Sequence, residues 1–408
     1  MKKKGLDYMK YIVVLGDGMA DEPLDALEQR TPLMAAVTPQ LDQLAKLSEL
    51  GLAHTIPEGM KPGSDTANLA VLGYNPKVYY SGRSPLEALS IGVDMKPTDI
   101  AIRCNVVTLT EDEKSYEDRT ILDHSSGEIS TEDAAILIDA VKKELENSIY
   151  KFYVGTSYRH LTIWDQGEVI DLSQPHDILG KVIGEYLPDD TALREMMKKS
   201  YDILNNHPIN VARKARGLNK ANSIWFWGAG TKPTLISFEE KNHIKGAMIS
   251  AVDLLKGIAV GAGMKVIEVP GADGTLHTNY EGKALAGVKV LLEEDYDYVY
   301  IHVEAPDEMG HQGNVSNKVK SIEYLDQRVI KIVMDEMKKA GVDYRMLVMP
   351  DHPTPIRCRT HTSDAVPYLL YDSTAEQDNT WQYNEAEAKL SGNVILEGYT
   401  VINKLISK

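Results

Sequence analysis

Five residues in the last part of the sequence carry side chains that commonly bind divalent metal ions. Asp307 and His311 are separated by four positions in EAPDEMGHQGN, so one helical turn would place both on the same face, towards a single ion. Asp351 and His352 are adjacent in MPDHPTP, where a tight turn before the next proline would aim both side chains inward, and His361 follows in RCRTHTS. A mixed carboxylate and imidazole set suits Mn²⁺ or Zn²⁺ better than Ca²⁺, which prefers oxygen ligands.

Two earlier residues complete this set. Asp17 lies between glycines in GDGMAD, and Ser64 in KPGSDTAN precedes the helical pattern of residues 67–72. Ser64 would therefore lie at or near a helix N-terminus, where the helix dipole and free backbone N–H groups favour both an alkoxide and a bound phosphate. A free serine is a weak nucleophile at neutral pH, and a coordinated metal ion would activate it. The residues together predict a two-metal phosphoryl-transfer site with Ser64 as the nucleophile.

The elements that must position these residues are apolar strands. The run YIVVLG ends at Asp17, residues 298–303 lead into the Asp307 cluster, and residues 346–349 lead into Asp351. Because α/β sheets place their sites at the carboxyl ends of strands, we expect the three strand exits to meet at one edge. Residues 39–51 are expected to form a helix with Leu41, Leu44 and Leu47 on one face.

The middle of the chain differs from its two ends. Residues 86–231 carry charged helical patterns, short strands and a basic stretch, and the metal-type residues lie outside them. We therefore expect a discontinuous metal-binding domain formed by residues 1–85 and 232–408, interrupted by an inserted domain of residues 86–231. The segment WFWGAGTKP is expected to be the crossover by which the chain returns to the first domain.

The composition excludes some classes of protein. The chain of 408 residues has a formal net charge of −16. This argues against a nucleic-acid binder, whose affinity comes mainly from neutralising phosphates with Lys and Arg. An anionic substrate would need a local cationic pocket to overcome the global field. The GDGMAD run is not a dinucleotide fingerprint either, because Asp21 replaces its last glycine.

Cysteine usage and the N-terminal region indicate where the protein is found. Cys104 and Cys358 are the two cysteines of the chain, too few for a disulfide framework, so a reducing cytoplasm is the simpler location. The apolar run of residues 11–15 is too short for a signal-peptide core or a membrane span. We expect a cytoplasmic protein without a membrane or nucleic-acid partner, and its oligomeric state stays open.

At this point a family resemblance is plain. The runs GDGMAD, KPGSDTANLAVLGY, EAPDEMGHQGN and MPDH, with a later histidine, are similar to cofactor-independent phosphoglycerate mutases of the archaeal type, a branch of the alkaline phosphatase superfamily. The likeness extends from Tyr11 to about Leu370. It implies an α/β fold with an alkaline-phosphatase-like central sheet sandwiched by helices and an inserted smaller α/β cap domain that binds the substrate.

The resemblance also implies two divalent metal ions, with Mn²⁺ expected and Zn²⁺, Co²⁺ or Mg²⁺ as alternatives. Carried over residue by residue, it assigns one ion to Asp17, Ser64, Asp351 and His352, and the other to Asp307, His311 and His361. Ser64 would attack the phosphoryl group of 3-phosphoglycerate, and the 2-hydroxyl of the retained glycerate would take it back from the phosphoserine. No bisphosphoglycerate primer would be needed.

A mutase must retain glycerate and keep water out, so the inserted domain should close over the site and supply cations. Arginine is suited to this task because its planar fork binds carboxylate and phosphate bidentately. The candidates for substrate binding are Arg103, Arg159, His160, Arg213 and Arg216. Asp123 and His124 in ILDHSSGEIS are similar to the family's acid/base region, and they receive no role here.

Other functions are compatible with the same two-metal frame. A phosphatase or sulfatase would share the metals but lack a cap that protects the phosphoenzyme. A small-molecule kinase of the homoserine type could reuse the serine and the metals, and the absence of G-x-x-x-x-G-K-[ST] excludes only a P-loop kinase. A binding module without catalysis would leave the nucleophile and a complete ligand set idle.

Overall fold

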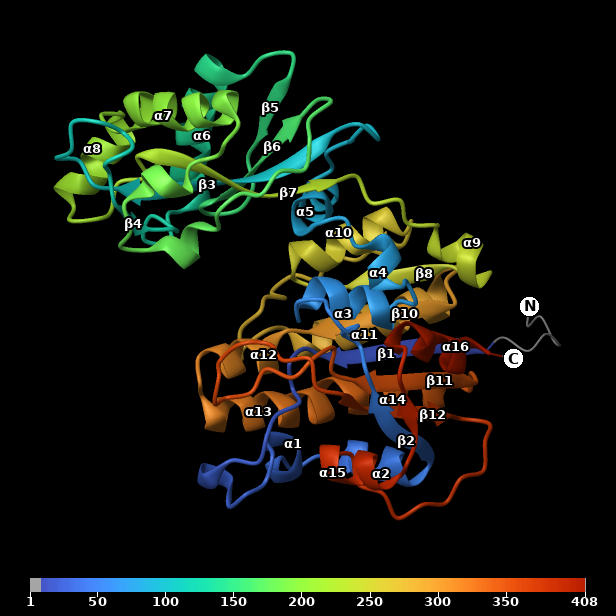
Figure 1. The fold of residues 1–408 in the computed structure, drawn as a ribbon. Coiled ribbons are helices and arrows are strands. Elements are labelled where there is room, and N and C mark those ends of the chain that lie inside the picture. Colours follow the sequence, from blue (N-terminus) through green and yellow to red (C-terminus); the bar gives the residue numbers. More distant parts are fainter. Residues whose placement is uncertain (1–8, 408) are drawn as a thin grey trace. The chain divides into compact units, whose positions relative to one another are not determined.

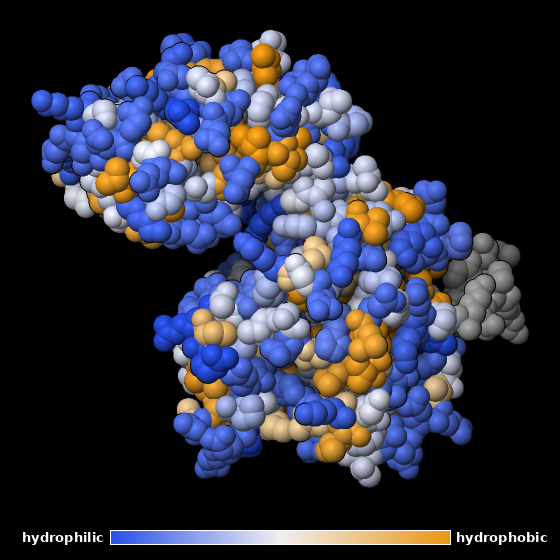
Figure 2. Space-filling view, viewed as in Figure 1, coloured by the Kyte–Doolittle hydropathy of each residue, from blue (hydrophilic) through white to orange (hydrophobic). Residues whose placement is uncertain are grey.

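The computed structural model describes residues 9–407, which form two compact units (Figure 1). One unit combines the chain up to Tyr80 with the chain from Thr234 onward, and the other comprises Ser81–Pro233. Each unit has its own sheet and its own buried apolar cluster. Hydrophilic residues cover most of the face of each unit seen in Figure 2, with apolar residues scattered among them.

The discontinuous unit is built on an eight-stranded mixed sheet of order β13-β2-β12-β11-β1-β10-β8-β9. Strand β12 is antiparallel to both of its neighbours, and the other strand pairs are parallel. The strands are β1 (Lys10–Gly16), β2 (Ser48–Ala53), β8 (Gly246–Ile249), β9 (Lys265–Val266), β10 (Tyr298–Val303), β11 (Tyr344–Met349), β12 (Val366–Asp372) and β13 (Val394–Ile395). The three strands expected from their apolar runs are therefore confirmed as β1, β10 and β11, and they are neighbours.

Helices cover both faces of this sheet, as the resemblance implied. On one face, Val299 and Ile301 of β10 join a core with apolar residues of α2 (Pro39–Lys46), α11 (Tyr280–Glu293), α13 (Val315–Leu325) and α14 (Lys331–Ala340). Tyr300 points the other way because side chains alternate along a strand, and its hydroxyl donates to Asn68 of α3 (Ser64–Val71). Helix α10 (Asp253–Gly261) contacts α3, and α16 (Val401–Ile406) contacts β11. The fold is thus an α/β sandwich of helices around a mixed sheet.

The helices of this unit are α1 (Pro32–Ala35), α2 (Pro39–Lys46), α3 (Ser64–Val71), α4 (Pro76–Tyr79), α9 (Phe238–Asn242), α10 (Asp253–Gly261), α11 (Tyr280–Glu293), α12 (Ala305–His311), α13 (Val315–Leu325), α14 (Lys331–Ala340), α15 (Glu385–Leu390) and α16 (Val401–Ile406). Short 3₁₀ turns occur at Asp25–Leu27 and Gly398–Thr400, and a π-helical turn at Asp326–Ile330 joins α13 to α14. Among residues 9–407, no helix is long and apolar enough to span a membrane.

The helix expected over residues 39–51 is wrong in its second half. Helix α2 ends at Lys46 and the chain continues as β2, so Leu41 and Leu44 are buried while Leu47 is 38 % exposed. Pairing with β12 and β13 on both sides outweighs the local helical pattern. Gly51 fits this close packing, because a Cβ there would lie 2.7 Å from the carbonyl oxygen of Asn393.

The second unit contains a five-stranded sheet, in which the long central strand β3 pairs antiparallel with β4, β6 and β7. The strands are β3 (Ile100–Leu109), β4 (Ile121–Asp123), β5 (Tyr150–Tyr153), β6 (Arg159–Trp164) and β7 (Ser223–Thr231), and the helices are α5 (Arg83–Ser90), α6 (Thr131–Leu145), α7 (Thr191–Leu204) and α8 (Pro208–Ala215), with 3₁₀ turns at Pro175–Ile178 and Ile183–Tyr186. The expected crossover segment WFWGAGTKP forms most of β7, and its proline is the last residue of the unit.

Candidate active site

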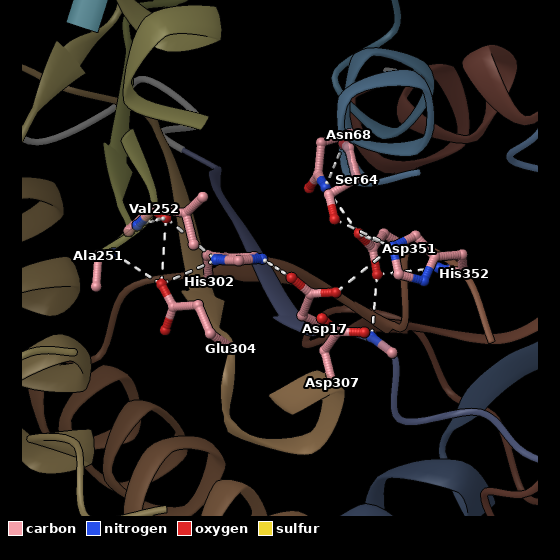
Figure 3. Close-up of polar contacts among 12 residues, drawn as sticks. Asp17, Ser64, Asn68, Ala251, Val252, His302, Glu304, Asp307, Asp351 and His352 are labelled. Carbon is pink, nitrogen blue, oxygen red and sulfur yellow. Dashed lines mark hydrogen bonds and ion pairs between the residues drawn. The ribbon is translucent and has the colours of Figure 1, made fainter. Parts of the chain in front are cut away.

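The site lies at the carboxyl ends of three neighbouring strands (Figure 3). Gly16 at the end of β1 is in register with Val303 at the end of β10, and Leu15 with Met349 at the end of β11. Because the strands are parallel and end together, the residues that follow them meet at one edge of the sheet. Asp17 follows β1 directly, α12 begins two residues after β10, and Asp351 comes two residues after β11.

The first cluster of metal-type side chains, here called the buried group, comprises Asp17, Asp351 and His352. One donor atom from each lies within 4.8 Å of the others. His352 Nε2 is 3.3 Å from Asp351 Oδ2 and 3.7 Å from Asp17 Oδ1. Ser64 Oγ is 3.1 Å from the same imidazole nitrogen, so the serine faces this group.

The second cluster, here called the half-buried group, comprises Asp307, His311 and His361. Asp307 and His311 lie one turn apart on α12, as their spacing predicted, with His311 Nε2 3.2 Å from Asp307 Oδ2. His361 Nε2 is 3.0 Å from His311 Nε2 and 3.5 Å from Asp307 Oδ1. All three side chains direct donor atoms towards one point.

Polar contacts fix the carboxylate of Asp351. Its Oδ1 accepts hydrogen bonds from the backbone N–H groups of Gly18, at 3.1 Å, and His352, at 2.9 Å. Its Oδ2 accepts one from Asn68 Nδ2 at 2.8 Å, and the same amide donates to the Ser64 carbonyl oxygen. Gly18 has a φ of 59°, and a Cβ there would lie 2.5 Å from Asp307 Oδ1, so only glycine fits between the two groups.

The pKa values of the metal-type side chains reflect how closely their carboxylates lie together. Burial and the carboxylates of Asp351 and Asp307 raise the pKa of Asp17 well above its usual value. Burial opposes ionisation of Asp307 too, but hydrogen bonds from His311 and His361 outweigh it and hold the pKa of that carboxyl well below its usual range. The hydrogen bond to Asp307 raises the pKa of His311 to about 9, whereas burial lowers the pKa of His352.

These donor sets fit bound divalent cations. Three carboxylates converge in a buried volume, where a cation would relieve their repulsion. Asp17 Oδ1 is buried and has no hydrogen-bond partner among the described residues, as expected of an oxygen that a metal ion would engage. Each group offers carboxylate and imidazole donors at a spacing suited to one ion. The protein therefore has the chemistry of a divalent-metal enzyme.

Ser64 is the first residue of α3, which confirms its expected place at a helix N-terminus. The preceding Gly63 serves as N-cap without a side-chain hydrogen bond to the helix, and Asp65 Oδ1 accepts from the Thr66 N–H at 2.8 Å, so the N–H groups of Ser64 and Asp65 stay available for an anion. Ser64 combines this position with the short distance to His352, which places its hydroxyl beside both metal donors and free N–H groups.

Two of the five residues expected to bind substrate lie close together in the second unit. Arg103 on β3 is buried, forms an ion pair with Glu87, and lies with its guanidinium 4.3 Å from the Trp227 ring centre. Arg159, exposed at the start of β6, lies close enough for its charge to stabilise the carboxylate of the same glutamate. Burial opposes ionisation of Glu87, but the charges of Arg103, Arg83 and Arg159 lower its pKa.

The other three expected residues are elsewhere. His160 is buried within the sheet, where its Nδ1 accepts from the backbone N–H of Gly155 and burial lowers its pKa to about 3. Arg213 is buried and donates to the carbonyl oxygens of Ser126 and Asn219. Arg216 is exposed, and both of these arginines lie within 4.0 Å of Asp133 on α6. The structure therefore does not gather the five residues into one cluster.

Sequence reasoning missed several polar residues that support the site. Asn68 orients Asp351, His302 contacts Asp17, and Glu304 contacts the other side of the His302 ring (Figure 3). A signal was available for the last two, since a histidine inside the apolar run YVYIHV and a glutamate directly after it are unusual in a buried parallel strand. The long-range pairing of Asn68 with Asp351 carries no comparable local signal.

Comparisons with known proteins agree with the motifs. A sequence profile of the family described as 2,3-bisphosphoglycerate-independent phosphoglycerate mutase matches residues 45–210. The chain is 46 % identical over 405 residues to a protein of Geobacter sulfurreducens named probable 2,3-bisphosphoglycerate-independent phosphoglycerate mutase, covering 98 % of this chain and all of the relative. It is 47 % identical to the Methanosarcina barkeri protein of the same family, covering 98 % and 99 % of the two chains.

Two solved structures are similar to this chain over its full length. The PH0037 protein of Pyrococcus horikoshii superposes with a TM-score of 0.81 at 30 % identity, covering 98 % of this chain and 97 % of the other. The cofactor-independent phosphoglycerate mutase of Thermoplasma acidophilum superposes with a TM-score of 0.65 at 29 % identity, covering 98 % and 99 %. This likeness over the full length shows that the chain belongs to the family of 2,3-bisphosphoglycerate-independent phosphoglycerate mutases of the archaeal type.

Proposed function

We propose that this chain interconverts 3-phosphoglycerate and 2-phosphoglycerate through a phosphoserine at Ser64, without bisphosphoglycerate. The observation that carries the proposal is the position of Ser64 Oγ, at the N-terminus of α3 and 3.1 Å from His352 Nε2 of the buried group. The names of full-length relatives support the substrate class. The kinase and phosphatase alternatives have no comparable support.

The reaction needs two transfers at one serine. Ser64 Oγ gives up its proton and bonds to phosphorus while the bond from phosphorus to the 3-oxygen of phosphoglycerate breaks, and that oxygen takes up a proton to leave glycerate. The 2-hydroxyl of glycerate then gives up its proton and attacks the phosphoserine, and Ser64 Oγ regains a proton as its bond to phosphorus breaks. The free N–H groups at the start of α3 would bind the transferring phosphoryl oxygens, and Asn68 would hold Ser64 through its carbonyl oxygen.

We propose that Asp17, Ser64, Asp351 and His352 hold one divalent ion, and that Asp307, His311 and His361 hold the other. When bound, the ions would lower the pKa of the serine hydroxyl and neutralise charge on the phosphoryl group. Mn²⁺ is the ion we expect, because mixed carboxylate and imidazole donors suit it. The fold fixes the positions of these side chains, since every one except Ser64 lies just after β1, β10 or β11 or in the segment that follows.

Substrate retention is proposed to depend on cations of the second unit. Arg159 is the leading candidate because its guanidinium is exposed and lies beside Arg103 around one glutamate. Arg103, His160, Arg213 and Arg216 stay candidates from the sequence, although Arg213 and His160 already make buried hydrogen bonds within the unit. Replacing Arg159 by methionine should raise the KM for phosphoglycerate more than replacing Arg216 by methionine.

The deciding experiment is a coupled assay for 2-phosphoglycerate formed from 3-phosphoglycerate on Mn²⁺-loaded protein, without added bisphosphoglycerate. A parallel reaction contains ATP and homoserine. Metal-dependent formation of 2-phosphoglycerate supports the mutase. Silence in that assay together with ATP consumption in the second would replace it with a kinase, and release of inorganic phosphate from 3-phosphoglycerate would replace it with a phosphatase.

A further inference from the structure

A buried chain of charged and polar side chains runs away from Asp17, opposite to the metal donors (Figure 3). His302 Nε2 lies 3.0 Å from Asp17 Oδ2, and His302 Nδ1 lies 3.0 Å from Glu304 Oε1. The ammonium of Lys283 pairs with the other oxygen of Glu304 and donates to the His302 carbonyl oxygen. These four side chains, here called the relay, are each no more than 5 % exposed.

The relay comes from elements that otherwise bury apolar side chains. His302 is the fifth residue of β10, on the face opposite Val299 and Ile301, and Lys283 projects from α11. Burying such groups costs several kcal/mol each unless their partners are well placed. Here the partners are present, since the Ala251 N–H donates to Glu304 Oε1 at 2.7 Å and Ser250 Oγ lies 3.1 Å from His302 Nδ1.

The relay is not a third metal site. The oxygens of Glu304 already accept from Lys283 and from the backbone N–H of Ala251. The Lys283 ammonium therefore occupies the place beside Glu304 where a further cation would have to bind. Two buried atoms here have no hydrogen bond among residues 9–407: His302 Nε2, whose contact with Asp17 Oδ2 is an ion pair at 3.0 Å, and Asp17 Oδ1, which lies on the side of His352 Nε2.

We propose that His302 is a positioning residue, which holds Asp17 Oδ2 so that Oδ1 is directed at the metal ion of the buried group, with Glu304 and Lys283 fixing the imidazole ring. This inference rests on the proposed metal site. Among residues 9–407, the contact that holds Asp17 Oδ2 is the one with His302, whereas the carboxylate of Asp351 accepts three hydrogen bonds, two from backbone N–H groups and one from Asn68. Without His302 the carboxylate of Asp17 can rotate, and loss of such an outer contact typically lowers metal affinity about 10- to 100-fold.

The half-buried group supplies an internal reference. Its residues are held by contacts outside the relay, because His311 Nδ1 lies 2.9 Å from the carbonyl oxygen of Arg359 and the hydroxyl of Thr354 donates to Asp307. A defect in the relay should therefore weaken one of two Mn²⁺ sites. General destabilisation of the fold would weaken both.

Two substitutions at one position separate positioning from packing. In His302→Gln the amide nitrogen reaches the place of Nε2 and keeps a donor for Asp17, whereas in His302→Asn the shorter amide reaches only the place of Nδ1. We expect His302→Gln to keep Mn²⁺ affinity at both sites within about threefold and His302→Asn to lose about 10- to 100-fold at one site. Tyr298→Phe on the same strand is the control, because its buried hydroxyl has no hydrogen-bond partner among the described residues.

The measurement is a Mn²⁺ titration followed by the electron paramagnetic resonance signal of the free ion, with thermal unfolding of each metal-free variant alongside. Two sites in the unchanged protein, one weakened in His302→Asn and both retained in His302→Gln and Tyr298→Phe, support the inference. Equal affinities of the Asn and Gln variants, or loss at both sites in proportion to a lower Tm, would overturn it. Failure of the unchanged protein to bind two ions would overturn the proposed metal centre, and the inference with it.

Discussion

The two metal-donor groups differ in how the chain builds them. Asp17, Asp351 and His352 are no more than 3 % exposed and stand directly after the central strands β1 and β11. In the half-buried group, the side chains of Asp307 and His361 are 16 % and 20 % exposed, Asp307 belongs to helix α12, and His361 lies further along the segment after β11 than Asp351 and His352 do. One group is therefore fixed by the sheet, and the other is partly open to solvent.

This difference suggests a division of labour. Ser64 faces the buried group, whose carboxylates are restrained by backbone N–H groups, Asn68 and His302. Precise placement matters most where the nucleophile must lie in line with phosphorus, since small displacements cost large factors in rate. The half-buried group is open enough to meet a substrate that arrives with its own negative charge.

Ser64→Ala should lower turnover by at least about 1,000-fold, because the variant has no nucleophile for the first transfer. Both metal groups should still bind Mn²⁺, since five of their six side chains do not contact the serine. The matched control is Ser316→Ala, which removes an exposed serine from the first turn of another helix, α13. Steady-state rates from the coupled assay decide the matter, and activity retained in Ser64→Ala would remove this serine from the mechanism.

Asp351→Ala and Asp307→Ala should each bind one Mn²⁺ ion instead of two, because the altered group keeps only two imidazoles in Asp307→Ala and only Asp17, His352 and the neutral hydroxyl of Ser64 in Asp351→Ala. The metal-free proteins should also differ in stability. Asp351→Ala leaves the N–H groups of Gly18 and His352 without an acceptor and removes one of the two acceptors of the Asn68 amide, so thermal unfolding should show it to be the less stable variant. Similar stability of the two variants would mean that the buried group is not specially restrained.

The half-buried group should bind metal more weakly as the pH falls. In the metal-free protein the pKa of His311 is raised to about 9, mainly by its hydrogen bond to Asp307. The ion needs the unprotonated Nε2, so below that pKa it must displace a proton, and the affinity should fall by up to about tenfold per pH unit. Above pH 9 it should level off. Calorimetric titrations in buffers of different ionisation enthalpy would detect the released proton, and an affinity that does not change between pH 9 and 7 would contradict this.

Asn68→Ala should have a small effect, about a tenfold loss of turnover. The variant removes the donor to Asp351 Oδ2 and to the Ser64 carbonyl oxygen, but Asp351 keeps two backbone hydrogen bonds. Tyr300→Phe, which removes the hydroxyl that donates to Asn68, should cost less still. A loss in Tyr300→Phe larger than that in Asn68→Ala would show that the tyrosine acts by another route.

The strands and the convergence of the metal-type residues could be predicted from the sequence because both depend on local patterns. Apolar runs ending in Asp17 and before Asp351 fixed the strand exits, and the spacing of Asp307 and His311 matched one turn of α12. Residues 48–51 were misassigned to a helix because their state depends on pairing with β12 and β13, which are distant in the sequence.

Roles that depend on a partner could not be predicted in the same way. Arg103 has Glu87 as its ion-pair partner, and Arg213 is surrounded by backbone carbonyls, and neither environment can be read from the residues next to them in the chain. The relay is a similar case, because Lys283 and Asp17 are far apart in the sequence and are linked, through Glu304 and His302, only in the folded chain. A buried histidine in a strand was a visible signal, but its function depended on which carboxylates it touches.

The most direct test of the account is to trap the phosphoenzyme. Mn²⁺-loaded protein would be mixed with 3-phosphoglycerate labelled at phosphorus, quenched in acid within milliseconds and digested for peptide mapping. We expect the label on the peptide that carries Ser64, and we expect no labelled peptide when Ser64→Ala is treated in the same way. Label on another residue, or turnover to 2-phosphoglycerate with no labelled peptide at any quench time, would contradict the account.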